Sequence, residues 1–430
     1  MKVSPLRIVT DSLLNFVSGL GTSKDKNAFS SYTFTELSKQ QLDAAYRGDW
    51  IARKAVDIPA ADATREWRAW QADEKQIELI EATEKTFGIQ RKVKGAIQRA
   101  RLYGGGGLVL GVEVGQPEDE LIVDQVRQGS LKYVHCVSRQ DLTSGAINLN
   151  VLSPYYGQPE FYEVNTVDGR RTKVHPSRVV RFVGAPPLDI SLVSDGWGDS
   201  IIQAVDDAIK NVGNTSGNIA AIVHESKIDV VRIPKLMESI GDADYRSKLT
   251  ERLTLANTTK STLNTLIMDK EEEWQRITAS FTGLPDILKL YLLIVSGAVD
   301  IPATRFLGQS AVGLGATGEG DTRNYYDRIA AEQNNELSDD IVMLDEILIR
   351  TAIGSRDPAI HYQWNPLYQM DVTQAAEVSL KNAQAHKIDV DSGLIDQEVL
   401  RVARQNQLIE SGFYPGLEAA IEDVGQTEVD

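Results

Sequence analysis

Two histidine triplets are the parts of this 430-residue sequence whose residue types and spacing could do chemistry. They read His175-Pro-Ser177 and His224-Glu-Ser226. Two such triplets can cleave a phosphodiester if one imidazole acts as a base and the other as an acid. That mechanism needs both triplets on adjacent strands facing one groove. We expect His175 near the start of a strand and His224 at the end of a long helix, and proline is a poor central-strand residue. The pattern therefore favours structural roles over paired catalysis.

Four consecutive glycines, Gly104–Gly107, could be taken for a phosphate-binding loop. In such loops a strand comes first and the glycines open a helix, whose N–H groups meet the anion. Here a helix is expected before the glycines and a strand after them, so we predict a tight helix-to-strand turn. The five histidines have no helix-face metal spacing. We therefore predict no metal site and no cofactor.

The composition fits a folded, acidic protein. Hydrophobic residues make up 42% and charged residues 25%, which excludes disorder, and the formal net charge is −16. A protein that holds duplex DNA by neutralising phosphates needs the opposite balance. One cysteine, Cys136, excludes a disulfide framework. Asp11 interrupts the apolar N-terminal patch, and no run of about 18 apolar residues occurs, so we predict neither a secretory signal nor a membrane span.

Hydrophobic periodicity predicts an α+β body followed by long helices. Helices are expected at 35–47, 50–61, 76–87 and 90–103, and strands at 108–112, 133–137, 160–164 and 179–183. Long helices follow at 199–224, 286–299 and 321–353, with strand-like runs at 228–233, 263–268 and 274–277, and a polar helix at 245–255. The tail is predicted helical at 373–386 and 396–410. Trp67 and Trp70, three residues apart, are expected to pack on one helix face.

Glycines mark two further places. Gly213 and Gly217 lie four residues apart in the helix at 199–224, a spacing that suggests the close approach of a neighbouring helix; a simply tolerated loss of stability is the alternative. The segment 308–320 holds five glycines in thirteen positions and cannot form one regular element. A loop of this length between two helices is usually functional or disordered.

The order of these parts resembles the portal (head-to-tail connector) proteins of tailed phages, in particular the DUF1073 group. The residues that carry the resemblance are Tyr46-Arg-Gly-Asp-Trp50, Asp57-Ile-Pro59, Trp67-Arg-Ala-Trp70, Ala100–Gly107, Trp197-Gly-Asp-Ser200, Ile301–Ser310, Ala316-Thr-Gly-Glu319 and Asn324-Tyr-Tyr-Asp327. The resemblance covers nearly the whole chain. It implies an α+β portal fold with wing, stem, clip, channel loop and crown.

The resemblance also implies a domain layout. The N-terminal arm would be 1–34, the wing 35–198 and 321–370, the stem 199–225 and 281–302, the clip 226–280, the channel loop 303–320 and the crown 371–430. It further implies a homo-oligomeric ring, usually of twelve subunits, at one capsid vertex of the virion, assembled in the host cytoplasm. The ring would be a conduit for genome packaging and ejection. Its partners would be the terminase large subunit, head–tail adaptors, capsid and scaffold proteins, and double-stranded DNA passing without sequence specificity, with no membrane.

Carried onto this sequence, the resemblance implies four sets of site residues. The DNA-channel loop would present Gln309, Ser310, Gly313, Leu314, Gly315 and Thr317. An acidic helix would present Glu319, Asp321, Asp327 and Glu332, whose charge would keep DNA from sticking. Gly213 and Gly217 would pack the stem, and Lys235, Arg246, Arg252 and Lys260 would dock terminase or adaptors.

On this interpretation the protein is structural and not an enzyme. One alternative is a two-histidine phosphodiesterase that acts on cyclic nucleotides, with His175 and His224 as the catalytic pair. Relatives of the resembled group linked to an anti-defence phosphodiesterase domain exist, but we expect this chain to be too short for a separate one. Another alternative is a different minor capsid or adaptor protein.

Overall fold

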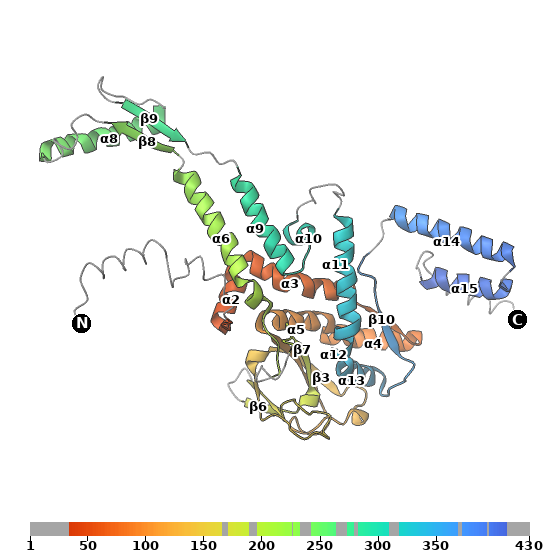
Figure 1. Cartoon of the computed structure of the whole chain (residues 1–430). Coiled ribbons are helices and arrows are strands. Elements are labelled where there is room, and N and C mark those ends of the chain that lie inside the picture. The colour runs from red at the N-terminus through yellow and green to blue at the C-terminus, as the bar shows by residue number, and fades with distance from the viewer. Residues whose placement is uncertain are drawn as a thin grey trace, which may run out of the picture. The chain divides into compact units, whose positions relative to one another are not determined.

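The computed structural model describes residues 34–165, 171–188, 196–225, 227–232, 242–263, 273–278, 283–308, 318–368, 372–393 and 395–410. The chain divides into two compact units, Met1–Asn365 and Pro366–Asp430 (Figure 1). The described part of the second unit is a pair of helices, α14 (Val372–Ser392) and α15 (Gln397–Glu410). The predicted mixture of helices and strands is confirmed.

The first unit begins with capped helices. Between residue 34 and the first long strand, the helices are α2 (Lys39–Gly48), α3 (Trp50–Arg65), α4 (Glu74–Phe87) and α5 (Ile89–Tyr103). Ser38 caps α2 in a capping box with Gln41, and Asp49 caps α3 by accepting from the backbone N–H of Ile51 at 2.7 Å. These side chains satisfy backbone donors that the first helical turn leaves free, which fixes where each helix starts.

Two antiparallel sheets of three strands follow. The first has the order β3-β2-β7, and the second β4-β5-β6. Their strands are β2 (Gly105–Val112), β3 (Leu131–Ser138), β4 (Leu142–Ser144), β5 (Tyr162–Asn165), β6 (Arg171–Val174) and β7 (Val179–Val183). Short 3-10 turns lie at Val123–Gln125, Arg139–Asp141 and Pro176–Arg178. The central strand β2 is buried on both faces: Leu108 and Leu110 pack in one core cluster and Val109 in another.

The glycine run joins α5 to β2. Gly104 ends α5 in the left-handed conformation, at φ 82°, and Gly105–Gly107 already belong to the strand. A Cβ at Gly106 would stand 2.2 Å from the Ala96 carbonyl oxygen of α5. Here only glycine lets the helix lie so close to the strand. The helix-to-strand turn is therefore as predicted, and the glycines that follow it serve packing.

The main core lies where α4, α5 and α13 (Val342–Ile353) meet the first sheet. Ile80, Val93, Leu108, Leu344 and Ile347 are fully buried there. A two-stranded sheet closes one side, in which β1 (Arg68–Gln71) pairs antiparallel with β10 (His361–Trp364). The chain from residue 342 to 364 thus returns to pack on elements formed by residues 68–112.

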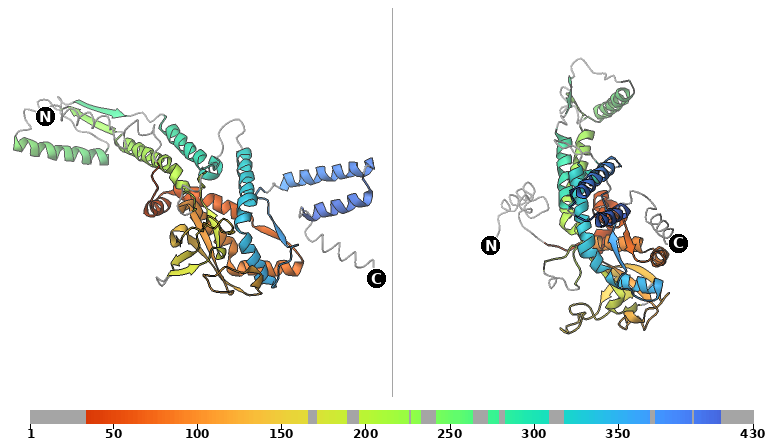
Figure 2. Two further views of the ribbon diagram at one scale, coloured as in Figure 1. Left: turned by 60° about the horizontal axis from the view of Figure 1, so that its bottom comes forward. Right: turned by 90° about the vertical axis from the view of Figure 1, so that its right-hand side faces the viewer.

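Two long helices lead away from this body. Helix α6 (Ile201–Glu225) packs along α9 (Leu284–Ala298), and Figure 2 shows the pair side by side in both views. Beyond them β8 (Lys227–Arg232) pairs antiparallel with β9 (Glu273–Thr278), and α8 (Ala243–Leu263) lies between these strands in sequence. The short α10 (Ala303–Leu307) follows α9.

The structure corrects the single long helix expected at 321–353. Helix α11 (Glu319–Glu332) passes into a π-helical turn, Gln333–Leu337, then α12 (Ser338–Asp340) and α13. The Ser338 hydroxyl donates to the Gln333 carbonyl at 2.9 Å, and the Gln333 amide donates to the Ala63 carbonyl of α3 at 2.8 Å. These side-chain bonds hold the widened turn, which hydrophobic periodicity does not reveal.

The two tryptophans also differ from expectation, because they lie at a strand and not on a helix. Trp70 is in β1 and packs edge-to-face on Tyr362, while Trp67 directly precedes β1 and packs on Trp364. Trp70 thus contacts the interior from a strand and Trp67 from the residue before it. Successive side chains of a strand point to opposite faces, so the two do not share one helix face.

Candidate functional site

His175 lies at the junction of the second sheet and β7. It caps the 3-10 turn Pro176–Arg178, in which proline at the first position fixes the backbone. The His175 Nδ1 atom accepts from the Ser177 backbone N–H at 3.2 Å and lies 2.8 Å from the Ser177 Oγ. Because Nδ1 is the acceptor, the neutral imidazole carries its proton on Nε2. The His-x-Ser spacing therefore forms a capped turn.

The surroundings of His175 keep its ring neutral. Burial lowers the pKa of His175, and Arg178 lowers it further, while Glu120 and Asp119 oppose the shift. The ring of Tyr155 stands edge-on at 5.1 Å, and its hydroxyl donates to Glu120 Oε1 at 3.1 Å. A neutral imidazole with an Nε2 proton can donate to an oxygen of a phosphodiester, and a carboxylate nearby can accept a proton.

The structure does not bring the second triplet to this place. His224 is in the last turn of α6, whose first half is buried at Ile202 and Val205 while Ile222 and Val223 are exposed. The 25 residues of α6 span roughly 37 Å, at 1.5 Å per residue. Figure 1 shows α6 leading away from β6, the strand that ends just before His175. The paired arrangement that the two-histidine mechanism requires is therefore not formed within one chain.

The predicted channel residues fall mostly beyond the described part of the chain. The six loop residues lie within 309–317, which the structure does not describe. Of the acidic set, Glu319 starts α11, Asp321 and Asp327 are exposed on it, and Glu332 ends it. Contact of these residues with DNA stays a prediction.

The predicted stem glycines lie in α6, as expected. An added Cβ at Gly213 or Gly217 would meet no atom within 4 Å, so no helix in the described part of the chain approaches them closely. Of the predicted docking cations, Arg246, Arg252 and Lys260 lie on α8, and Lys235 falls outside the described residues. Their roles stay predictions.

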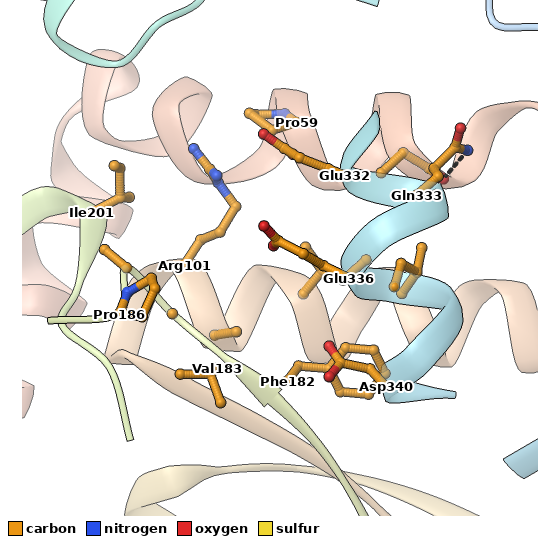
Figure 3. A pocket seen from close by; sticks show the side chains of 16 residues that line it. Pro59, Arg101, Phe182, Val183, Pro186, Ile201, Glu332, Gln333, Glu336 and Asp340 are labelled. Atoms are coloured by element: carbon orange, nitrogen blue, oxygen red, sulfur yellow. Dashed lines mark hydrogen bonds between the residues drawn. The ribbon is translucent and has the colours of Figure 1, made fainter. Parts of the chain in front are cut away.

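A pocket that the sequence did not suggest lies between α5, β7 and the π-helical turn. It has a volume of about 290 Å³. Glu332, Glu336 and Asp340 stand in a row along one side, and Arg101 faces the first two from the other side (Figure 3). The four-residue spacing of these acids is the sequence signal that could have found it, because residues four apart share a helix face.

The charges of this pocket are poorly compensated. Glu332 forms an ion pair with Arg328 at 3.3 Å, but the side chains of Glu336 and Asp340 form no hydrogen bond or ion pair with any described residue. Burial by surrounding protein, and then the Glu336 charge, raise the pKa of Asp340 to about 7, although part of its surface meets solvent. Burial lowers the pKa of Arg101.

Metal chemistry finds no support in the part of the chain that the structure describes. No group of three histidine, cysteine, aspartate or glutamate side chains there could hold a metal ion.

None of the described helices combines the length and the apolar character that crossing a bilayer requires.

Comparisons with known proteins place the chain in a family. A family model described as phage portal protein matches residues 40–388. A protein of Caulobacter sp. (strain RHG1) named "Anti-CBASS protein Acb1" is 45% identical over 97% of this chain and 69% of its own length. A protein of Sphingomonas paeninsulae with the same name is 37% identical over 97% of this chain and 68% of its own length. The neck of a native gene transfer agent particle computed with C12 symmetry has a similar fold, with a TM-score of 0.54, 14% identity and coverage of 92% of this chain and 98% of that one.

These relatives overturn two predictions made from the sequence. The protein was expected to be a structural conduit for packaging and ejection, and not an enzyme. Relatives named for action against a defence system, at 45% and 37% identity, contradict both expectations. They favour the alternative of an anti-defence enzyme acting on cyclic nucleotides. The resemblance in fold and family is confirmed: the chain belongs to the phage portal protein family.

Proposed function

We propose that this protein is an anti-defence enzyme that degrades a cyclic nucleotide. The observation that carries the proposal is the 45% and 37% identity with the two anti-CBASS proteins across 97% of the chain. The alignments span 69% and 68% of those relatives, so about a third of each lies outside the comparison. Turnover by this chain alone therefore distinguishes its own activity from that of the remaining third of the relatives.

The His175 cluster is the group of described residues best suited to the chemistry. Hydrolysis adds water to phosphorus, breaks one bridging P–O bond and delivers a proton to the leaving oxygen. In this proposal the exposed Glu120 carboxylate takes the proton of the attacking water and returns it to the leaving oxygen, while the His175 Nε2–H stays on the ring and donates a hydrogen bond to a phosphoryl oxygen, where negative charge develops. Ser177 holds the ring, since it lies 2.8 Å from Nδ1. His224 has no part in the reaction.

The test is turnover by the purified chain. Cyclic dinucleotides and trinucleotides are incubated with it, and linear products are separated by ion-exchange chromatography. We expect His175→Ala to slow turnover by about a hundredfold or more, since removing one positioned hydrogen-bond donor to developing charge costs about 10²–10³-fold. His224→Ala is the matched control and should keep the wild-type rate.

Absence of turnover by the folded wild-type chain refutes the enzymatic proposal. The activity that names the relatives would then belong to the part of them outside the alignment. Turnover that needs His224 as well as His175 would refute the site but keep the function, and would show that two chains combine their triplets.

We also propose that copies of the chain assemble into a ring within a virion. The similar fold comes from a particle neck computed with C12 symmetry. In the single chain, α9 leaves Ile287, Leu290, Leu293 and Ile294 between 47% and 58% exposed. An uncovered apolar face of this kind is typical of a protein–protein contact. Terminase, adaptors, capsid and scaffold proteins and DNA stay predictions as its partners.

A further inference from the structure

We propose that residues 6–20 of a neighbouring copy cover the exposed apolar face of α9. The contact presupposes the proposed ring, since it joins adjacent copies, and it has no bearing on the enzymatic proposal. One side of it is a helix face that the described chain leaves uncovered. The other side is a segment before the described residues whose apolar side chains recur with a matching spacing.

The uncovered face of α9 is apolar along the helix. Four large side chains on it are between 47% and 58% exposed, namely Ile287, Leu290, Leu293 and Ile294. The sequence from 290 to 299 contains no Asp, Glu, Lys or Arg. Val295 is fully buried on another side of the same helix, where α9 packs on the rest of the chain. An exposed apolar row of this kind marks a contact with protein.

The N-terminal sequence contains a second apolar row. Its members recur in steps of three and four, with one extra residue beside them: Leu6, Val9, Leu13, Phe16, Val17 and Leu20. In a helix these six positions share one face about 100° wide, while Asp11 and Asn15 fall on the opposite face. Such spacing is typical of a segment that lays its apolar side on an apolar surface of another protein element.

Two hydrogen bonds fix the place from which this segment leaves the body. The backbone N–H of Leu37 donates to Gln203 Oε1 at 2.8 Å, and Gln203 Nε2 donates to the Thr35 carbonyl oxygen at 2.8 Å. Gln203 is in the first turn of α6, the helix that packs along α9 (Figure 2). Residues 1–33 therefore join the body at the base of the two-helix pair that carries the uncovered row.

The position of this junction favours the α9 of a neighbouring copy. A closed ring repeats one heterologous contact, in which one side of each copy meets a different side of the next. Here the segment joins the body on α6, whereas the uncovered row lies on α9. Fully extended, residues 21–33 span about 45 Å, roughly four helix diameters. Residues 6–20 can thus reach past their own helix pair to the next copy.

Cross-linking between two kinds of chain tests the contact. Both chains carry Cys136→Ala, which removes the native thiol, and tags of different mass. One chain adds Leu13→Cys, and the other adds Leu290→Cys. After co-assembly, a short bis-maleimide reagent should give a covalent dimer of one chain of each kind on a denaturing gel. Val151→Cys, at a side chain that is 77% exposed, replaces Leu290→Cys in the control and should give about tenfold less of that dimer.

Sedimentation gives a second, independent measurement. Leu13→Asp places a charge in the apolar row of the segment, and we expect it to weaken self-association by about tenfold or more. Asn15→Asp is the matched control, because it adds the same charge on the opposite face. It should leave self-association unchanged.

The contact is refuted if the wild-type chain assembles but the two cysteine chains give no more mixed dimer than the control. It is also refuted if a chain carrying both Leu13→Cys and Leu290→Cys cross-links only within itself, since residues 6–20 would then cover the α9 of their own copy. A wild-type chain that stays monomeric refutes the ring, and the contact with it.

Discussion

Arg68 and Arg101 both lie near carboxylates, but they differ in their partners. Arg68 forms ion pairs with the carboxylates around it, whereas Arg101 binds a backbone carbonyl. Arg68 is buried and donates from Nε and Nη2 to Glu84 at 3.1 and 2.8 Å, and from its Nη1 to Asp345 at 2.7 Å. Burial alone would lower the pKa of Arg68, but Asp345 and Glu84 outweigh it and raise the pKa. Arg101 instead donates to a carbonyl, and the acids opposite it stay mostly unpaired.

The difference separates a charge cluster that is paired inside the protein from one whose acids face solvent. Around Arg68 two carboxylates meet one guanidinium, and the rings of Trp70 and Tyr362 lie 4.5 and 4.4 Å from it. Both carboxylates have Arg68 as their ion-pair partner. Around Arg101 the carboxylates of Glu336 and Asp340 are exposed, so water can donate to them, while the buried Gln333 Oε1 has no donor among the described residues.

The largest expected effect comes from removing the first arginine. Arg68→Leu leaves Glu84 and Asp345 buried without a cation, and we expect it to lower the free energy of unfolding by about 3–5 kcal/mol. Urea denaturation followed by circular dichroism measures this. Adding Glu84→Leu and Asp345→Leu should recover part of the loss, because no buried charge remains. If Arg68→Leu lowers the free energy of unfolding by less than about 1 kcal/mol, the Arg68 cluster is well hydrated. The contrast between Arg68 and Arg101 would then no longer hold.

Removing the second arginine should cost much less. Arg101→Met loses two hydrogen bonds to the Ala55 carbonyl but no short ion pair, so we expect a decrease of about 1–2 kcal/mol in the same measurement. Methionine keeps most of the apolar stem of the arginine side chain, so the variant mainly removes the charge and the hydrogen bonds, as Arg68→Leu does. A loss as large as that of Arg68→Leu would mean that Arg101 also neutralises the pocket acids, and would contradict the comparison.

The smallest effect concerns pH. The pKa of Asp340 is about 7 in the folded chain, against 3.8 ordinarily, so the folded state holds its proton more tightly. Stability contributed by this group therefore falls as pH rises from about 4 to 7, where Glu336 and Asp339 repel the charge and Arg181 attracts it. Asp340→Asn should be more stable than wild type at pH 8, by no more than about 1 kcal/mol because water screens the exposed side. Thermal unfolding at pH 3 should show no difference between the two, and a difference of the same size there would refute the assignment.

Much of the fold follows from local sequence. Helices α3, α4, α5, α6 and α9 begin and end within a few residues of their predicted bounds, because apolar periodicity and capping residues act over short distances. Strand β7 was predicted at its observed bounds, Val179–Val183. Periodicity failed at the π-helical turn, where bonds from Ser338 and to Ala63 decide the backbone. It failed again at β1, whose pairing partner β10 lies almost 300 residues away.

The sequence indicated the His175 triplet but not the pocket near Arg101. The His175 triplet was found by its residue types, but its capped turn and its distance from His224 depend on how α6 leaves the body. The pocket was missed because Arg101 and the acids from Glu332 to Asp340 lie more than 200 positions apart. In the sequence, acids spaced along one helix indicate a solvent-exposed face. Only the structure shows that Arg101 lies opposite them.

By itself the sequence determined the family, the α+β class and the order of elements, since these depend on motifs and on patterns within a few residues of each other. Only the tertiary structure decided which charges are satisfied. Compensation depends on which side chains meet within a few ångströms, and here those contacts join α3 to the π-helical turn Gln333–Leu337 and β1 to α13. The free energy of a buried charge is set by these neighbours and not by its place along the chain.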